Sequence, residues 1–265
     1  DRFLSPYISA YRKNYSTQHV LLRLVENWKE NLDQNNFVGA IVTDLSKAFD
    51  CIPHDLLIAK LSSYGFDMSA LCYIHSYLNN RKQCVKIDNT YSTFKSLISG
   101  VPQDSILGPI LFNISINDLF YKIKKATILN FADDNTLSAF SQTIPTLVKI
   151  LESEAEITIK WLKNNKMIVN PDKFQVIILD KKKGDHTNEK IIVDNKPLNA
   201  VSSVKLLGIV LDDKLNFNLH ISNICRSAAN QLNALGRLKS FINFEQRKVM
   251  IDSYFMSNFN YCSLI

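Results

Sequence analysis

The spacing of hydrophobic positions along the chain predicts where helices and strands lie. Apolar residues recur every three to four positions over 16–33 and 144–167, which is typical of amphipathic helices. Ser16 or Thr17 stands where a cap of the first helix would be. The period changes over 37–45, where a compact β-branched run predicts a buried strand.

Shorter patterned stretches account for the rest of the chain. Helices are expected over 54–65, 68–82 and 110–125, and helical patterns return over roughly the last fifty residues. Strands are expected over 126–131, 135–140, 190–198 and 204–215, with a turn into a strand over 169–180 and a hairpin over 83–99 around Asp88-Asn89. The elements do not alternate regularly as βαβ units, and we find neither a repeat nor a linker. The sequence therefore predicts a mixed α/β or α+β domain.

Composition and charge narrow the protein class. The chain is 46% hydrophobic and 21% charged, and no apolar run approaches the length of a membrane span, so we expect a soluble globular protein without a membrane partner. The five cysteines are scattered and form no CxxC pair, which indicates an intracellular protein of the cytoplasm or nucleus. The net charge of +6 is compatible with a polyanionic partner. The first residue is not Met and the last ones are apolar, so we expect a segment of a longer protein.

Two adjacent carboxylates, Asp133 and Asp134, interrupt the apolar stretch 131–140. A surface turn is one interpretation, because Asp and Asn tolerate tight-turn geometry. If the strand that ends at Asp44 is their neighbour in one sheet, however, three carboxylates converge, and neighbouring like charges are unfavourable without a cation. Mg²⁺ prefers such oxygen ligands, and two ions about 4 Å apart serve phosphoryl transfer. A divalent-metal site and a surface turn are therefore the two interpretations.

Five segments in one order carry a resemblance to a known family. They are TDLSKAFDCIPHDLL (43–57), GVPQDSILGPILFNISINDL (100–119), FADDNTL (131–137), NPDKF (170–174) and KLLGIVLDDKLNFNLHI (205–221). Together they resemble the motifs of reverse transcriptases of non-LTR (LINE-type) retrotransposons, and SAYRKNYST (9–17) resembles the fingers motif of that family. The resemblance covers nearly the whole chain.

The resemblance implies a right-hand polymerase with palm, fingers and the start of a helical thumb. The implied domains are a partial fingers region over 1–39, a palm over 40–215 with an inserted fingers segment at about 65–100, and the start of the thumb over 216–265. The implied function is RNA-directed DNA polymerase activity, which transfers a nucleotide from a dNTP to a primer 3′-OH. Two Mg²⁺ ions, with Mn²⁺ as a substitute, would assist it, and the partners would be an RNA template, a DNA primer and dNTPs. A linked endonuclease is expected in the full-length element and is absent from this chain.

The family's catalytic and metal-binding residues map onto four side chains and one carbonyl. Asp44, Asp133 and Asp134 match the catalytic carboxylates, and the carbonyl of Leu45 is expected as a further metal ligand. Lys173 matches a lysine near the triphosphate, where it could act as a general acid, although a turn lysine is an equally good interpretation.

Further residues match positions that contact substrates. Phe49 would abut the sugar and disfavour a 2′-OH, with core packing as the alternative, and Gln103 would lie beside the incoming nucleotide and template. Arg12 and Lys13 match positions near nucleotide phosphates or template, with exposed surface as the alternative. The primer grip falls on Leu207 and Gly208, where glycine permits close backbone approach.

Other matched residues are interpreted as structural. They are Asp50, as a cap at a helix entry, with His54, Asn117 and Asp118.

The chain also departs from the family pattern. Asp104 stands in the substrate-binding loop where the family nearly always has Gly, Asn14 and Tyr15 replace Gly and Arg, and Asn135 and Phe174 stand where Thr is commoner. These departures keep a second hypothesis open, a catalytically decayed nucleic-acid-binding remnant. A third is an unrelated Mg²⁺-dependent phosphohydrolase that carries an Asp pair.

Overall fold

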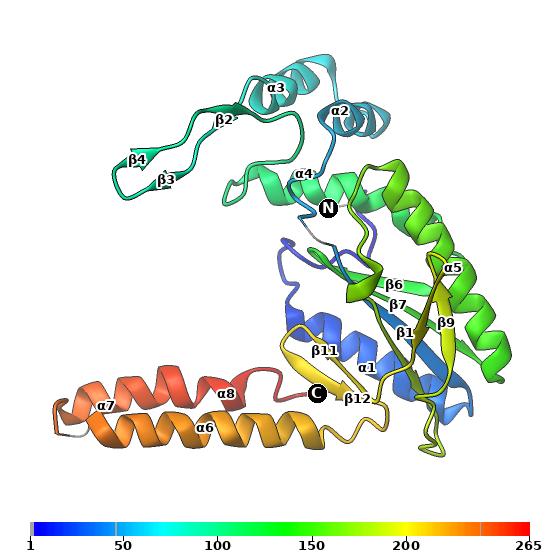
Figure 1. Cartoon of the computed structure of the whole chain (residues 1–265), viewed down its shortest axis with the longest axis vertical. Coiled ribbons are helices and arrows are strands. Elements are labelled where there is room, and N and C mark those ends of the chain that lie inside the picture. Colours follow the sequence, from blue (N-terminus) through cyan, green and yellow to red (C-terminus); the bar gives the residue numbers. More distant parts are fainter. Residues whose placement is uncertain (1–2, 46, 239) are drawn as a thin grey trace.

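A four-stranded antiparallel sheet in the order β6-β7-β1-β8 forms the centre of the molecule (Figure 1). The computed structural model describes residues 3–45, 47–238 and 240–265, and the side chain of Asp44 lies outside that description. The strands are β1 (Phe37–Asp44), β6 (Thr127–Phe131), β7 (Asp134–Ser141) and β8 (Gln175–Leu179). β1 pairs along its whole length with β7, so the predicted strands and the predicted α+β class are both present.

Two long helices, α1 (Thr17–Asp33) and α5 (Ile144–Asn164), bury opposite faces of the sheet. Successive residues of a strand point to opposite faces, so Ala40 joins the hydrophobic cluster of α1 whereas Ile41 joins that of α5. Gly39 lets α5 approach, because a Cβ there would lie 2.6 Å from a methyl carbon of Leu151. The sheet is therefore covered on both sides, which fixes its register.

The periodicity of the two helices predicted their buried sides correctly. Val20, Leu24 and Trp28 of α1 are buried, and the Ser16 hydroxyl caps the helix by accepting a hydrogen bond from the His19 N–H at 3.3 Å.

Glu154 of α5 is buried, although the sequence pattern placed the charged residues of this helix on its exposed side. Its carboxylate accepts hydrogen bonds from the backbone N–H groups of Lys124 and Lys125, in the loop before β6, which compensates for the burial of the charge.

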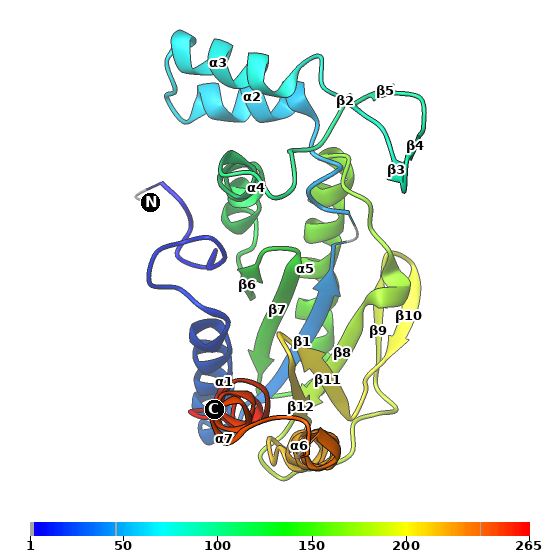
Figure 2. The same ribbon diagram turned by 90° about the vertical axis from the view of Figure 1, so that its left-hand side faces the viewer.

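A second group of elements lies at one end of the molecule, and the C-terminal helices lie at the other (Figure 2). The first group comprises α2 (His54–Ser63), α3 (Met68–Leu78), α4 (Leu107–Ile116) and the short strands β2 (Lys82–Gln83), β3 (Lys86–Ile87), β4 (Thr90–Tyr91) and β5 (Lys95–Ser96). β3 pairs with β4 and β2 with β5, which makes the predicted hairpin. α3 ends before residue 82, the predicted end, because Asn79 is extended and Asn80 has a φ of +56°.

The helix predicted over 110–125 is shorter in the structure. α4 ends at Ile116 and a 3₁₀ helix, η1 (Asn117–Tyr121), follows. The Asn117 side chain is fully buried and binds outside its helix, since its oxygen accepts from the Ser5 N–H at 2.7 Å and its nitrogen donates to the Tyr64 hydroxyl at 2.9 Å. These contacts agree with the structural role predicted for Asn117.

Two segments that were predicted as single strands are hairpins. They form β9 (Lys190–Val193) with β10 (Lys196–Asn199), and β11 (Ser203–Leu206) with β12 (Ile209–Asp212). Each segment folds back because two residues form a tight turn in it, Asp194-Asn195 in the first hairpin and Leu207-Gly208 in the second. All four have φ between +46° and +86°, the left-handed region that closes a two-residue turn.

The C-terminal part is helical, as predicted. It consists of α6 (Asn218–Leu238), α7 (Phe244–Met250), a π-helical turn η3 (Ile251–Phe255) and α8 (Ser257–Asn260). α6 lies alongside α7 and α8, and together these helices project away from the sheet (Figure 1). Within the described residues, no helix combines the length and the hydropathy that crossing a membrane would need.

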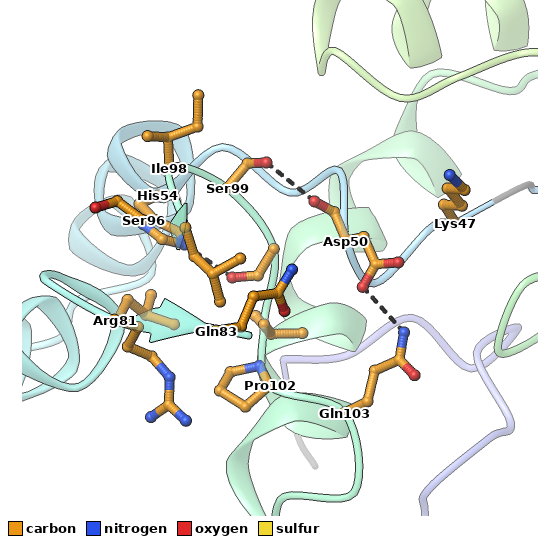
Figure 3. A pocket seen from close by; sticks show the side chains of 14 residues that line it. Lys47, Asp50, His54, Arg81, Gln83, Ser96, Ile98, Ser99, Pro102 and Gln103 are labelled. Carbon is orange, nitrogen blue, oxygen red and sulfur yellow. Dashed lines mark hydrogen bonds between the residues drawn. The ribbon is translucent and has the colours of Figure 1, made fainter. Parts of the chain in front are cut away.

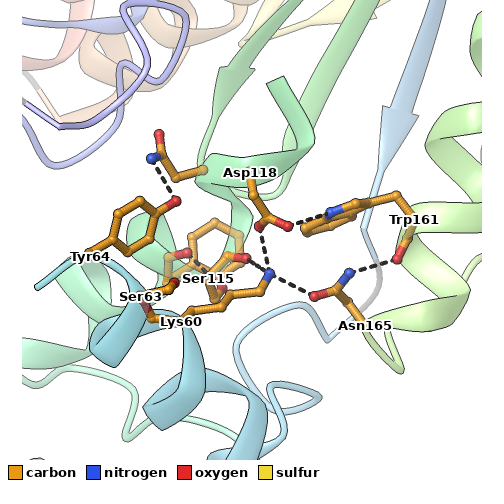
Figure 4. Close-up of polar contacts among 9 residues, drawn as sticks. Lys60, Ser63, Tyr64, Ser115, Asp118, Trp161 and Asn165 are labelled. Atoms are coloured by element: carbon orange, nitrogen blue, oxygen red, sulfur yellow. Dashed lines mark hydrogen bonds and ion pairs between the residues drawn. The ribbon is translucent and has the colours of Figure 1, made fainter. Parts of the chain in front are cut away.

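A largely buried ammonium group joins α2 to α4, η1 and the end of α5 (Figure 4). Lys60 of α2 donates to the Ser115 carbonyl at 2.5 Å, to Asp118 at 2.6 Å and to the Asn165 side chain at 2.7 Å. The Trp161 indole N–H donates to the other Asp118 oxygen at 2.9 Å. Burial lowers the pKa of Lys60, and the hydrogen bond and charge of Asp118 offset part of that decrease. The node connects α2 to η1 and α5 and gives Asp118 the structural role predicted for it.

We expect Lys60→Met to lower the free energy of unfolding by about 2 kcal/mol, because it removes the Lys60 donor from both Asp118 and Asn165 and leaves Asp118 with the Trp161 indole as its donor. Asp118 is 37% exposed, which reduces the effect relative to a fully buried pair. Urea denaturation followed by circular dichroism measures it. Lys29→Met removes the exposed pair with Glu26 and should change stability by a few tenths of a kcal/mol. Equal effects of the two substitutions would contradict a central role for the node.

Candidate active site

The two adjacent carboxylates lie at the tight turn between β6 and β7. Phe131 and Asp134 are paired across this hairpin, and Ala132 and Asp133 form the turn, with Ala132 at a φ of +56°. Asp44 is the Cα partner of Asp134 on the other side of β7, and the N–H of the next residue donates to the Asp133 carbonyl at 3.1 Å. The backbones of all three predicted carboxylate residues therefore meet at one sheet edge, the arrangement expected from the sequence.

The buried side-chain amides of Asn130 and Asn135 stabilise this turn by hydrogen bonds to its backbone. Asn130, which is fully buried, donates to the Ala132 carbonyl at 2.6 Å and to the Asn135 side-chain oxygen at 3.0 Å. Asn135 in turn donates to the Asp133 carbonyl at 3.3 Å. No sequence pattern singled out Asn130, since an Asn inside an apolar strand has no local signal. Asn135, one of the departures from the family pattern, is part of the support of the carboxylate turn.

Lys173 lies at the same edge of the sheet. In the β1–β8 ladder Val42 is opposite Gln175, the first residue of β8, so Lys173 lies two residues before β8 at the end of the sheet where β1 ends in Asp44. Lys173 ends a short 3₁₀ turn, η2 (Pro171–Lys173), which Asn170 caps by accepting from the Asp172 N–H at 3.1 Å. The predicted turn into a strand is therefore present, and it brings this lysine's backbone to the edge where the carboxylates lie.

A pocket of about 460 Å³ opens beside Asp133. Its lining residues are Tyr11, Lys47, Ala48, Phe49, Pro102, Gln103, Asp104, Pro109 and Asp133. The Phe49 ring stacks on Phe112 with centroids 4.4 Å apart and meets Tyr11 edge-on at 6.1 Å. Phe49 thus packs against the core and also lines the pocket, so its two interpretations are compatible. Three residues predicted to bind substrate, Phe49, Gln103 and Asp104, lie together in this pocket.

The N-terminal loop contributes a different residue from those predicted. Tyr11 lines the pocket; burial raises the pKa of its hydroxyl, and the negative charge of Asp133 raises it further. Arg12 donates to the carbonyls of Ser5 and Ile8 at 3.0 and 2.9 Å, so it fastens its own loop. Neither Arg12 nor Lys13 is among the pocket's lining residues. The N-terminal loop thus lines the pocket through Tyr11, and the contact of Arg12 and Lys13 with nucleotide phosphates or template stays a prediction.

Asp50 holds Gln103 rather than capping a helix (Figure 3). The Gln103 amide donates to Asp50 at 2.9 Å, whereas α2 has Pro53 at its N-cap and no side-chain cap, so the capping prediction for Asp50 is wrong. Asp50 lies three residues before that N-cap, and the loop that carries Gln103 packs against it instead. Gly100 permits this contact with its φ of +88°, because a Cβ there would lie 2.8 Å from the Asp50 backbone.

Two backbone hydrogen bonds and one side-chain hydrogen bond join the same two segments. The N–H of Gly100 donates to the Ile52 carbonyl and that of Val101 to the Phe49 carbonyl, each at 2.8 Å. The His54 ring makes a 2.8 Å hydrogen bond to the Gly100 carbonyl, in keeping with its predicted structural role. Phe49 and Gln103, which come from distant parts of the sequence, are therefore fixed relative to each other.

Asp104 adopts a backbone conformation that favours glycine. Its φ is +55°, in the left-handed region where a Cβ is disfavoured. Its side chain also adds a carboxylate to the pocket that already contains Asp133. The departure from Gly at this position thus has both a conformational and an electrostatic consequence.

The predicted primer-grip residues form the turn of the β11–β12 hairpin. Leu207 and Gly208 have φ of +46° and +86°. The Tyr261 hydroxyl donates to the Leu207 carbonyl at 2.5 Å, and the Tyr261 ring lies 3.2 Å from where a Gly208 Cβ would stand. A Cβ at Gly208 would therefore press against the Tyr261 ring, which would have to shift by a few tenths of an ångström.

The end of the sheet where Asp44, Asp133 and Asp134 meet, which we call the carboxylate edge, offers oxygen donors that suit a divalent cation. Asp133, Asp134 and the Leu45 carbonyl offer hard oxygen atoms, the ligands that such cations prefer. The Leu45 carbonyl accepts one hydrogen bond, from the Ala48 N–H at 3.3 Å, and a carbonyl has a second lone pair. Among the described side chains, no three of the His, Cys, Asp and Glu type form a metal-binding group, and the Asp44 side chain lies outside that description.

We expect Asn130→Ala to lower the free energy of unfolding by about 1–3 kcal/mol, because the Ala132 carbonyl and the Asn135 amide lose a buried partner. In a double-mutant cycle with Asn135→Ala, the coupling free energy should be about 1 kcal/mol. Guanidinium denaturation of the two single variants and the double variant measures it. Additive effects would show that the two amides support the turn independently.

Comparisons with known proteins agree with this geometry. The family model described as reverse transcriptase (RNA-dependent DNA polymerase) matches residues 2–211. The probable RNA-directed DNA polymerase from transposon BS of Drosophila melanogaster is 28% identical over 94% of this chain and 28% of its own length. The RNA-directed DNA polymerase from mobile element jockey of the same species is 25% identical over 81% of this chain and 24% of its own length. The chain thus spans about a quarter of each relative.

The fold has a solved counterpart. A telomerase from Candida tropicalis in complex with a fragment of telomeric RNA superposes with a TM-score of 0.52, at 15% identity, over 94% of this chain and 42% of that one. At that identity the likeness concerns the fold alone, and it agrees with the palm-and-fingers fold predicted from the sequence. The chain therefore belongs to the reverse transcriptase (RNA-dependent DNA polymerase) family, and the two Drosophila relatives above are polymerases of non-LTR retrotransposons.

Proposed function

We propose that this chain is the polymerase part of a longer protein and copies an RNA template by adding dNTPs to the 3′-OH of a DNA primer. The observation that carries the proposal is the register of β1 and β7, which sets Asp44 opposite Asp134 beside the pocket of Phe49 and Gln103. Neither the carboxylate edge nor the pocket suffices alone, because nucleotide transfer needs both a reacting centre and a bound nucleotide. A linked endonuclease in the full-length protein is part of the same proposal.

In the proposed assignment, residues 40–215 form the palm, 1–39 and about 65–100 belong to the fingers, and 216–265 begin the thumb. Asp44, Asp133 and Asp134 would hold divalent cations, for which Mg²⁺ is the proposed ion and Mn²⁺ a substitute. When bound, such ions lower the pKa of an attacking hydroxyl and stabilise negative charge on a leaving phosphate oxygen. The oxygen donors at the sheet edge support this assignment.

The remaining roles follow from the residues around the pocket. Phe49, backed by Phe112, presents a rigid ring that would exclude a 2′-OH from a bound nucleotide. Gln103, held by Asp50, would contact the nucleotide or its template base in a fixed orientation. Lys173, at the same sheet edge, would stabilise the departing pyrophosphate or donate a proton to it.

A primer-extension assay on an RNA template with Mg²⁺ tests the proposed function. We expect template-directed extension that chelation of divalent cations abolishes and that Asp133→Asn lowers about 10³-fold, which is several kcal/mol of lost transition-state stabilisation. Glu156→Gln, which neutralises an exposed carboxylate on α5 that does not line the candidate pocket, is the matched control and should leave extension unchanged. Extension that is template-independent, or equal in the two variants, would refute the proposed function.

A second function, nucleic-acid binding without catalysis, is favoured by one observation. Asp104 combines a φ of +55° with a carboxylate in the pocket, and a triphosphate bound there would be repelled by it. If this residue alone limits the site, restoring the glycine that the family carries should restore nucleotide use.

Asp104→Gly should lower the KM for dNTP about tenfold, because removing one like charge at short range is worth about 1–2 kcal/mol. Steady-state extension at varied dNTP concentration measures it. Asp194→Gly is the control, since Asp194 has a similar φ of +53° but lies in the β9–β10 turn and does not line the pocket. Both substitutions relieve backbone strain, so a gain shared by both would indicate stability alone and contradict the electrostatic explanation.

A further inference from the structure

Tyr11 lies against the ring that is proposed to sense the sugar of a bound nucleotide. The Tyr11 ring meets the Phe49 ring at 88°, with centroids 6.1 Å apart, and both residues line the pocket that contains Asp133. Tyr11 is 55% exposed, so burial in the core does not explain why its ring stands there. The proposed function gives this residue no role.

The Phe49 ring is restrained from two directions. It stacks on Phe112 of α4, which is fully buried, with centroids 4.4 Å apart and 17° between the ring planes. Stacking on one surface leaves a half-buried ring free to tilt or slide along that surface. The contact with Tyr11 opposes this movement, because two aromatic rings at such a separation favour the edge-to-face arrangement.

Hydrogen bonds fix the backbone on both sides of Tyr11. The side chain of Asn113, which is buried in α4, donates to the Ala10 carbonyl at 2.9 Å, and Arg12 donates to two carbonyls of the same loop. These contacts maintain a φ of +60° at Tyr11, which a residue with a Cβ adopts only where its surroundings outweigh the strain. The helix that backs the neighbouring ring through Phe112 therefore also anchors this loop, through the next residue.

We propose that Tyr11 is a positioning residue, which holds the Phe49 ring in the one orientation that rejects a ribonucleotide. The inference rests on the proposed function, in which Phe49 excludes a 2′-OH from the bound nucleotide. A ring excludes an added hydroxyl only while it cannot turn aside, because the hydroxyl occupies any space that the ring gives up. Discrimination between dNTP and NTP therefore depends on the contact of Tyr11 with Phe49 as well as on the size of the Phe49 ring.

The order of the Phe49 ring is measured without catalysis. Para-fluorophenylalanine replaces Phe49 alone, and its fluorine NMR resonance is recorded in the wild-type chain and in Tyr11→Phe and Tyr11→Ala. We expect Tyr11→Phe to leave the resonance unchanged, because the ring edge is kept, and Tyr11→Ala to shift and broaden it, because the ring gains further orientations. Tyr121→Ala is the matched control, since it removes a tyrosine on η1 that is 58% exposed and does not line the pocket. A resonance that Tyr11→Ala leaves unchanged would overturn the inference.

Single-nucleotide extension of a DNA primer on an RNA template measures the sugar discrimination. The ratio of kcat/KM for a dNTP to that for the matching NTP should fall about fivefold in Tyr11→Ala and stay unchanged in Tyr11→Phe and Tyr121→Ala. In a chain that already carries Phe49→Val, Tyr11→Ala should leave the ratio unaltered, because the ring that Tyr11 positions is gone.

A merely structural role for Tyr11 predicts a different result. Its loss would lower the use of dNTP and NTP in proportion, and an unchanged ratio in Tyr11→Ala would overturn the inference. An equal fall of the ratio with and without the Phe49 ring would overturn it as well, because Tyr11 would then act on the nucleotide directly. A resonance that responds as expected, in a chain that extends a primer with neither nucleotide, would uphold Tyr11 as the residue that holds the ring and refute the proposed function.

Discussion

The antiparallel ladder between β1 and β7 holds the end of one strand against the start of the other, and the candidate site depends on that pairing. The ladder sets Asp44 opposite Asp134, and a hydrogen bond from the Leu45 N–H to the Asp133 carbonyl extends the ladder by one contact. Both faces of the sheet are buried, so a slip by one residue would turn every buried side chain toward the wrong face. The hydrophobic cores of α1 and α5 thereby fix the carboxylate edge, although neither helix contributes a carboxylate to it.

The pocket beside this edge depends on a second constraint, the packing of the loop 99–103 on residues 49–54. Gly100 is the residue that permits it, and the hydrogen bonds across it fix Phe49 and Gln103 relative to each other. Several non-glycine residues around the pocket have positive φ, among them Lys47, Asp104 and Ala132. Such strain is maintained only where surrounding contacts outweigh it, and it is concentrated where a site must keep one geometry.

The outer parts of the molecule are attached to this centre by polar contacts. Lys60 joins α2 to η1 and α5, and its three hydrogen bonds use all the protons of its ammonium group. At the other end, Tyr261 connects the C-terminal helices to the β11–β12 turn. A polar contact of defined geometry specifies an orientation that apolar packing alone would leave less restricted, so these contacts orient both ends relative to the sheet.

The sequence by itself determined the elements that have a strong period and the residues that local chemistry marks. The buried stripes of α1 and α5, the strand that ends at Asp44 and the cap at Ser16 follow from the spacing of side chains along the chain. The adjacent carboxylates and the ordered motifs also predicted the family correctly, because both are patterns within short segments.

The tertiary structure alone decided which distant residues meet. Asp50 and Gln103 are 53 residues apart and Lys60 and Asn165 are 105 apart, and no local pattern encodes such contacts. The same holds for Asn130, whose amide binds the carbonyl of the turn residue Ala132, and for Tyr11, which lines the pocket although no role was predicted for it. Side-chain direction depends on which surface the fold presents opposite each residue, and that surface exists only once the sheet has formed between its helices.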